Sequence, residues 1–229
     1  MSSSSSMPVR KARVSHAGTC ALLLDAGGNK FCLTTQQRFW ALAALDSPLR
    51  AYSWVKECVL GVNNLLLVYD PLAVDHAEAQ ARLLQLWDAS RPREEAGVKH
   101  EVPVDYDLSD HGDLAAIASN AGLTKQEVMQ LHSDAEYRVA CVGSLPGFAY
   151  LVGLPEQLFV PRRASPRPAM PKGGVIIGGT QAGIWPYTAP SGWHLLGSTN
   201  VDVFDLQWAR PSLLSPGDRV VFKIRGVSE

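Results

Sequence analysis

The feature that most constrains the fold of this chain is a 60-residue segment, 141–200, with few charges and many turn-forming residues. It contains 10 of the 19 glycines and 8 of the 15 prolines of the chain. Frequent glycine and proline turns between short apolar runs are typical of antiparallel sandwiches and closed barrels. We therefore expect the C-terminal part to be built mainly of β-strands. The charged residues of the segment are Glu156, Arg162, Arg163, Arg167 and Lys172.

Charge and hydrophobicity exclude several classes of protein for a chain of 229 residues. The formal net charge is −1 and the pI about 6.6, which is not the composition of a strongly basic nucleic-acid binder. No run of 18 apolar residues predicts a membrane span. The serine tract 1–6 lacks the basic and apolar regions of a secretion signal. Four scattered cysteines without a paired motif favour reduced thiols, so we expect a cytoplasmic protein.

The N-terminal part predicts a small α/β domain over residues 10–90, after a disordered leader at 1–9. Its elements alternate as two strands, a helix, two strands and a helix, an order that suggests a ferredoxin-like sandwich of one sheet and two helices. The charged, proline-containing segment 91–98 is the predicted linker. The predicted strands are 13–16, 21–25, 55–60 and 65–69, and the helices end at Asp46 and follow Pro71.

The C-terminal domain is predicted to span residues 99–229. A strand at 99–104 leads into two short helices, the first ending at Gly122 and the second opening with the capping box Thr124–Glu127. Alternating apolar residues and turns then continue to the end of the chain. The fold class is therefore α+β, with an α/β domain followed by an antiparallel barrel or sandwich.

No motif in the chain forms a complete catalytic site by itself. The glycine-rich run 178–183 has the pattern G-G-x-x-x-G, which matches neither the dinucleotide fingerprint nor the P-loop. His132 fits either a cation at a helix C-terminus or a group that binds substrate or transfers a proton. Arg162 fits either a solvated loop or a clamp for a carboxylate or phosphate. No metal site is expected from this chain alone.

Five sequence blocks, taken together, resemble one family, known as allophanate hydrolase subunit 1 or as the B-type subunit of 5-oxoprolinase. This family also includes the sporulation-kinase inhibitor KipI and one half of the carboxyltransferase domain of urea carboxylase. The resemblance covers nearly the whole chain after Val9. The blocks are L-H-S at 131–133, G-S-L-P-G-F-A-Y-L at 143–151, P-R-R-A-S-P-R at 161–167, G-G-T-Q-A-G-I-W-P at 178–186 and S-G-W-H-L-L-G at 191–197.

The resemblance implies a cyclophilin-like barrel in the C-terminal domain and a multi-subunit enzyme. The implied partners are a homologous C-type subunit of 5-oxoprolinase and a metal-dependent A-type subunit. The implied activity is the ATP-dependent opening of 5-oxo-L-proline to L-glutamate, with ATP shared among the subunits and this chain inactive alone. The alternatives are a subunit of an allophanate hydrolase or urea carboxylase and a KipI-like histidine kinase inhibitor.

The candidate site residues are transferred from the resemblance position by position. His132, Arg162 and Gln181 are the catalytic candidates. Gln181 is expected to hydrogen-bond an amide-like substrate, and Arg162 to neutralise a carboxylate or a developing phosphate charge. The glycines would let the backbone approach the substrate closely. The candidates for substrate binding are Gly178, Gly179, Trp185, Pro186 and Phe148.

Overall fold

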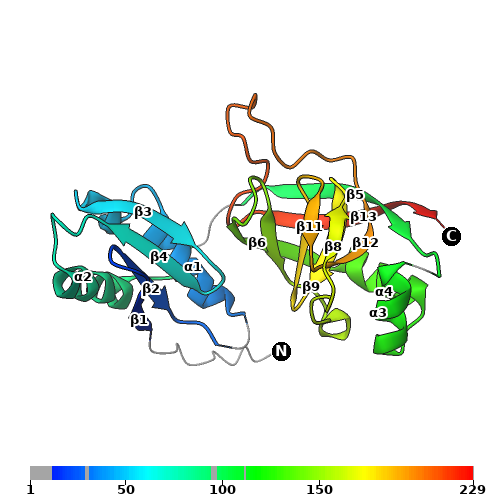
Figure 1. Ribbon diagram of the computed structural model, residues 1–229, viewed down its shortest axis with the longest axis horizontal. Coiled ribbons are helices and arrows are strands. Elements are labelled where there is room, and N and C mark those ends of the chain that lie inside the picture. Colours follow the sequence, from blue (N-terminus) through cyan, green and yellow to red (C-terminus); the bar gives the residue numbers. More distant parts are fainter. Residues whose placement is uncertain (1–11, 29–30, 94–96, 111, 229) are drawn as a thin grey trace, which may run out of the picture. The chain divides into compact units, whose positions relative to one another are not determined.

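A computed structural model describes residues 12–28, 31–93, 97–110 and 112–228 of the protein (Figure 1). The chain divides into two compact units, residues 1–95 and 96–229. The predicted leader lies outside the described residues, as do residues 94–96 of the predicted linker. Within the described ranges, no helix is both long enough and apolar enough to span a bilayer.

The N-terminal unit is a four-stranded antiparallel sheet covered by two helices. Its sheet order is β1-β2-β4-β3. Both helices contribute to one apolar cluster with the sheet, since Phe39 and Leu83 pack with Leu24 and Leu67. The predicted sheet and two helices are thereby confirmed. The elements are β1 (Arg13–His16), β2 (Ala21–Asp25), α1 (Leu33–Ala43), η1 (Pro48–Ala51), β3 (Val55–Leu60), β4 (Asn64–Tyr69) and α2 (His76–Ala89).

The first helix spans Leu33–Ala43 and ends three residues before the predicted Asp46. Its N-cap, Cys32, makes no side-chain capping bond, so no local signal marks the start. The buried Gln36 side chain instead binds the β3–β4 turn. It donates to the Gly61 carbonyl at 3.1 Å and accepts from the Asn63 N–H at 2.6 Å. Asn63 lies in this turn with φ 57°, a left-handed conformation that asparagine tolerates.

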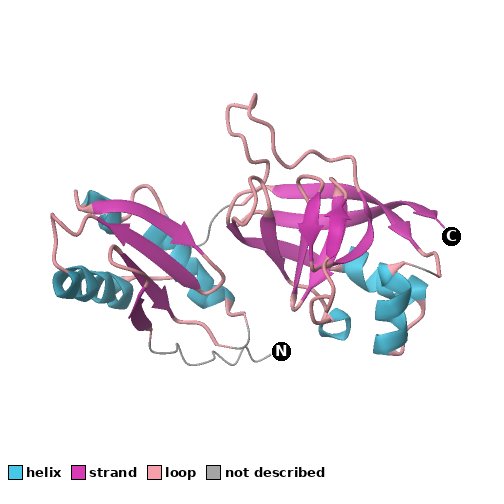
Figure 2. Cartoon of the chain, in the orientation of Figure 1, coloured by secondary structure: helices cyan, strands magenta, loops and turns pink. Residues whose placement is uncertain are grey.

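The C-terminal unit is a closed seven-stranded barrel with two helices and a separate two-stranded ribbon (Figure 2). The barrel order is β10-β7-β6-β13-β5-β12-β9, and β8 pairs with β11 outside it. The elements are β5 (Lys99–Asp107), α3 (Asp113–Ala121), α4 (Lys125–Asp134), β6 (Glu136–Val142), β7 (Ala149–Val152), η2 (Glu156–Leu158), β8 (Arg167–Met170), β9 (Gly174–Gly178), β10 (Gln181–Ile184), β11 (Ala189–Ser191), β12 (His194–Ser198) and β13 (Arg219–Ser228).

One strand pair departs from the predicted antiparallel barrel. Strands β5 and β13 are parallel, with Lys99 opposite Arg219 and Asp107 opposite Ser228. The other neighbouring pairs of the barrel are antiparallel. The two strands are separated in the sequence by residues 108–218, which satisfies the need of a parallel pair for a crossover rather than a tight turn.

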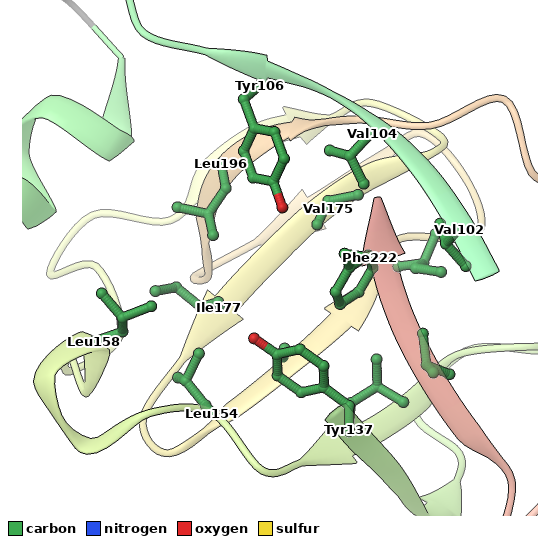
Figure 3. Packing of buried hydrophobic residues seen from close by; sticks show 14 of the residues in the cluster. Val102, Val104, Tyr106, Tyr137, Leu154, Leu158, Val175, Ile177, Leu196 and Phe222 are labelled. Atoms are coloured by element: carbon green, nitrogen blue, oxygen red, sulfur yellow. The ribbon is translucent and has the colours of Figure 1, made fainter. Parts of the chain in front are cut away.

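The barrel is filled by alternate side chains from its strands (Figure 3). Val102, Val104 and Tyr106 point inward from β5 with the period of two that a strand imposes. Tyr137 from β6 and Phe222 from β13 meet them, with their rings 5.2 Å apart. Leu114, Ile117 and Val128 of the two helices belong to the same cluster. The interior is therefore packed with side chains.

Residues 199–218 form the protruding loop, drawn in orange above the barrel in Figure 1. The two arms of its middle part are tied by backbone hydrogen bonds. Leu213 N–H donates to the Val203 carbonyl at 3.0 Å, and Asp205 N–H to the Pro211 carbonyl at 2.9 Å. Phe204 and Ser212 form an isolated β-bridge between them. The loop is thus a structured arm with an exposed tip at residues 206–210.

Candidate functional site

The side chains of strands β9 and β10 alternate between the inner and outer faces of the barrel wall. Ile177 and Ala182 face the interior cluster. Gly178 and Gln181 lie opposite each other across the hairpin, so their side-chain positions share the outer face. Ile176, which also faces outward, belongs to a second apolar cluster on that side.

Large aromatic rings cover the glycines of this outer face. A side-chain carbon at Gly178 would meet Trp193 Cδ2 at 2.9 Å, and one at Gly183 would meet Phe148 Cε2 at 2.7 Å. Both glycines are therefore needed for the rings to approach the backbone so closely. The Phe148 ring contacts the rings of Trp185 and Trp193 edge-on, with centroids 5.2 and 5.6 Å apart. We call Phe148, Tyr150, Trp185 and Trp193 the aromatic face.

Two polar candidates adjoin the aromatic face. The Arg162 guanidinium carbon lies 5.7 Å from the centre of the Trp193 ring, within range of a cation–π contact. Arg162 is exposed, and no carboxylate of the described residues pairs with it. Gln181 is half-buried, and it lies opposite Gly178 on the outer face of the barrel wall. A guanidinium and a carboxamide next to a wall of aromatic rings can bind a small planar ligand that carries a carboxylate.

The segment that carries Arg162 is anchored by a buried acid. Asp113 at the start of α3 pairs with Arg163, and with Arg167 at 2.9 Å. It also accepts a hydrogen bond from the Leu195 N–H at 2.8 Å. Burial alone would raise the pKa of the Asp113 carboxyl. The Leu195 bond and the two arginines outweigh burial and lower that pKa. The acid thus joins helix α3, strand β12 and segment 161–167.

The remaining candidates of this region have backbone or packing roles in the structure. Gly179 has φ +61° in the turn between β9 and β10, and its N–H donates to the Val160 carbonyl at 2.7 Å. That N–H is therefore engaged rather than free for a phosphate. Pro186 is buried directly after Trp185. The indole Nε1 of Trp185 is buried and has no hydrogen-bond partner among the described residues.

His132 lies apart from the aromatic face, inside the barrel cluster. Its side chain is fully buried, stacks on Phe222 at 4.6 Å and hydrogen-bonds the Tyr106 hydroxyl through Nδ1 at 2.8 Å. Burial lowers the pKa of the imidazole to about 3, so it is neutral at physiological pH. The Tyr137 hydroxyl donates to the His132 carbonyl at 3.0 Å. This placement supports packing rather than contact with a ligand at the outer face.

The structure thus brings most candidates together and separates one of them. Arg162 and Gly178 both lie at the ring of Trp193, and Gln181 is the cross-strand neighbour of Gly178. Phe148 and Trp185 continue the same face. Sequence reasoning did not select Asp113, because the arginines that it binds are 50 and 54 positions away. Among the described residues, no group of three or more His, Cys, Asp or Glu could hold a metal ion.

Comparisons with known proteins identify the family. Residues 12–214 match the carboxyltransferase domain, subdomain C and D. The chain belongs to this family. It is 39% identical to the B-type subunit of 5-oxoprolinase from Escherichia coli O157:H7 over 219 residues, covering 93% of this chain and 96% of that protein. It is 40% identical to the protein of the same name from Haemophilus influenzae over 192 residues, with coverages of 84% and 88%.

Solved structures agree with this family. The protein TTHA0988 superposes with a TM-score of 0.74 at 36% identity, covering 91% of this chain and 40% of that one. The urea amidolyase of Kluyveromyces lactis superposes with a TM-score of 0.81 over 96% of this chain and 15% of that one. At 17% identity, that second likeness shows the fold alone.

Proposed function

We propose that this chain is the B-type subunit of a cytoplasmic, ATP-dependent 5-oxoprolinase. The observation that carries the proposal is the identity of 39–40% to two proteins named for that role, over most of their lengths. In this proposal the chain acts with a homologous C-type subunit and with a metal-dependent A-type subunit, and is inactive alone. The unpaired state of its four cysteines is consistent with a reducing compartment.

The chemistry of the aromatic face is compatible with 5-oxo-L-proline. That substrate is a small ring bearing one carboxylate and one lactam amide. Arg162 offers a charged donor for the carboxylate, and Gln181 offers both a donor and an acceptor for the amide. The glycine-backed rings beside them supply an apolar wall. In the proposed reaction the lactam oxygen attacks the γ-phosphorus of ATP and ADP leaves. Water then adds to the activated ring carbon, the C–N bond breaks, and a second water releases phosphate to give glutamate.

In this proposal ATP binds within the assembled subunits rather than to a phosphate loop of this chain. The Gly178–Gly179 turn resembles a phosphate cradle in composition, but Gly179 N–H is bound to Val160. Arg162 is the positive charge that this chain offers at the aromatic face. In the proposed complex it neutralises either the substrate carboxylate or the developing charge of the transferred phosphoryl group.

The test is reconstitution with the cognate subunits, followed by measurement of ADP release with and without 5-oxoproline. Wild-type complex should release ADP only when the substrate is present. Arg162→Ala and Gln181→Ala should each lower turnover ~10²-fold if the side chain binds the transition state. Arg82→Ala, which changes an exposed arginine of α2, is the matched control and should leave turnover unchanged.

The same assay separates the related activities of the family. A rate of ATP turnover that is the same with and without 5-oxoproline would overturn the proposed substrate. Turnover that depends on urea or allophanate instead would assign the chain to that branch. Unchanged rates in both Arg162→Ala and Gln181→Ala would remove these side chains from the active site while leaving the proposed place of the chain in the enzyme intact.

A further inference from the structure

The protruding loop presents apolar side chains at its tip. Leu206 is 75% exposed and Trp208 36% exposed. Tyr187, which follows the aromatic face in the sequence, is 37% exposed, and its ring lies 6.0 Å from that of Phe204 in the loop. Large exposed apolar residues close together mark interaction sites more often than isolated ones do. Leu206 and Trp208 belong to none of the apolar clusters of the described residues, so packing within this chain does not explain why the tip carries them.

The tip is held in place before any partner arrives. The cross-arm bonds at Val203–Leu213 and Asp205–Pro211 fix the base of the tip. Phe204 packs on the barrel side, where a side-chain carbon at Gly147 would meet its Cβ at 2.5 Å. Asp205 further fixes the tip by accepting the Gln207 N–H at 2.9 Å. A preformed arm loses little conformational entropy on binding. Most of the free energy of its apolar contacts therefore contributes to affinity.

A cleft of about 400 Å³ opens at the base of the arm. Tyr187 and Phe204 give it aromatic walls. Its charges are two acids and one base. Lys172 pairs with Asp202 at 2.6 Å, and Asp205 acts on the same lysine at longer range, helping to raise its pKa. The cleft therefore carries one unbalanced negative charge beside aromatic rings. The lining residues are Lys172, Tyr187, Asp202, Phe204, Asp205, Leu206 and Gln207.

Aromatic walls with an excess carboxylate form a receptor for a cation. An arginine or lysine side chain can stack on the rings through its stem and head while its charge meets Asp205. A small anionic ligand would meet the repulsion of the excess acid. A purely apolar ligand would remove the Asp205 carboxylate from water without supplying a compensating charge. Charge complementarity thus selects a positively charged side chain as the occupant.

We propose that the protruding loop and this cleft together dock a partner protein through a basic side chain flanked by apolar residues. The basic side chain enters the cleft toward Asp205, and Leu206 and Trp208 pack on the flanking apolar surface. The partner is the homologous C-type subunit of the proposed enzyme, so this choice of occupant rests on the proposed function. The contact adds an interface to the aromatic face without using its candidate residues.

The experiment measures the affinity between this full chain and the C-type subunit, using sedimentation velocity or calorimetry. Leu206→Asp and Asp205→Lys should each raise the dissociation constant at least about tenfold, as expected for residues at the centre of an interface. Leu72→Asp is the matched control for the first change, because Leu72 is 97% exposed in the N-terminal unit. Asp134→Lys, at the exposed end of α4, is the control for the second. Both controls should bind within about twofold of wild type.

Three results would overturn the inference. The first is wild-type affinity in both Leu206→Asp and Asp205→Lys. The second is an equal loss in the control variants. The third is self-association of the isolated chain that Leu206→Asp abolishes while binding to the C-type subunit persists, since that would make a second copy the occupant. A wild-type complex that assembles but shows no 5-oxoproline-dependent ADP release would instead refute the proposed function and leave this interface supported.

Discussion

Replacing Gly178 by alanine tests whether the aromatic face depends on direct contact between a ring and the barrel wall. The added methyl would lie 2.9 Å from Trp193 Cδ2 and 3.1 Å from Cγ, closer than carbon atoms normally approach. Because these atoms belong to a rigid indole that is 5% exposed, the ring cannot turn its end away and must shift as a whole. Overpacking of this kind costs about 1–3 kcal/mol.

The shift has a second consequence at the candidate site. Arg162 lies over the same ring, so displacement of Trp193 should move the guanidinium as well. We expect Gly178→Ala to lower the free energy of unfolding of the barrel unit by about 1–3 kcal/mol. In the proposed reconstituted 5-oxoprolinase it should also raise the KM for 5-oxoproline. Hydrogen exchange of peptides from β9 and β10 during urea titration measures the stability of this unit separately from the other.

Gly143→Ala is the control for this change. A side-chain carbon at Gly143 meets nothing within 4 Å, and its φ is not in the left-handed range. That substitution should be neutral or slightly stabilising, because alanine restricts the unfolded chain. Equal stability of the two variants would refute the close contact on which the aromatic face is built.

Three further predictions concern buried titratable groups. Asp113→Asn should destabilise the barrel unit by about 1–3 kcal/mol in urea titrations. Because the folded-state pKa of Asp113 is lowered, its stabilising effect is present above the unfolded pKa and disappears as pH falls through the folded one, so the variant should lose less stability in acid. His132, with its pKa lowered to about 3, should remain neutral in NMR titrations from pH 8 to 5, and the barrel should lose stability as pH falls from about 6.5 toward 3; titration near pH 6.5 would contradict this burial. Cys141, whose pKa burial raises to about 12, should be alkylated by iodoacetamide at pH 8 more slowly than the three half-buried cysteines, and equal labelling would contradict its burial.

Local signals in the sequence predicted the elements that are controlled locally. The capping box at Thr124–Glu127 forms as expected, and Gly122 ends α3 with φ 67°. The glycine and proline turns predicted an antiparallel sandwich or a closed barrel in the C-terminal part, and the structure has the barrel. Such signals succeed because each depends on a few neighbouring residues. The start of α1 at Leu33 carried no such signal, since Cys32 does not cap it.

Features decided by distant residues were not predictable from the chain alone. The bulge between Val139 and Cys141 shifts the register of β6, so Cys141 pairs with Tyr150 of the outer cluster rather than continuing the inward face of Val139. The burial of His132 depends on Tyr106 and Phe222, which belong to the first and last strands of the barrel domain in the sequence. The blocks of the family resemblance located the aromatic face but could not separate ligand contacts from packing.

The parallel pairing of β5 with β13 has a consequence for how the barrel unit is made. These strands contain residues 99–107 and 219–228, which pair along nine positions, and β13 also joins β6. The barrel cannot close until the last of its strands has been synthesised. Until then β5 and β6 lack their β13 partner, and their edges remain unpaired. During translation, chains stalled before residue 219 should therefore be sensitive to proteases and prone to aggregate, while the N-terminal sheet is already complete.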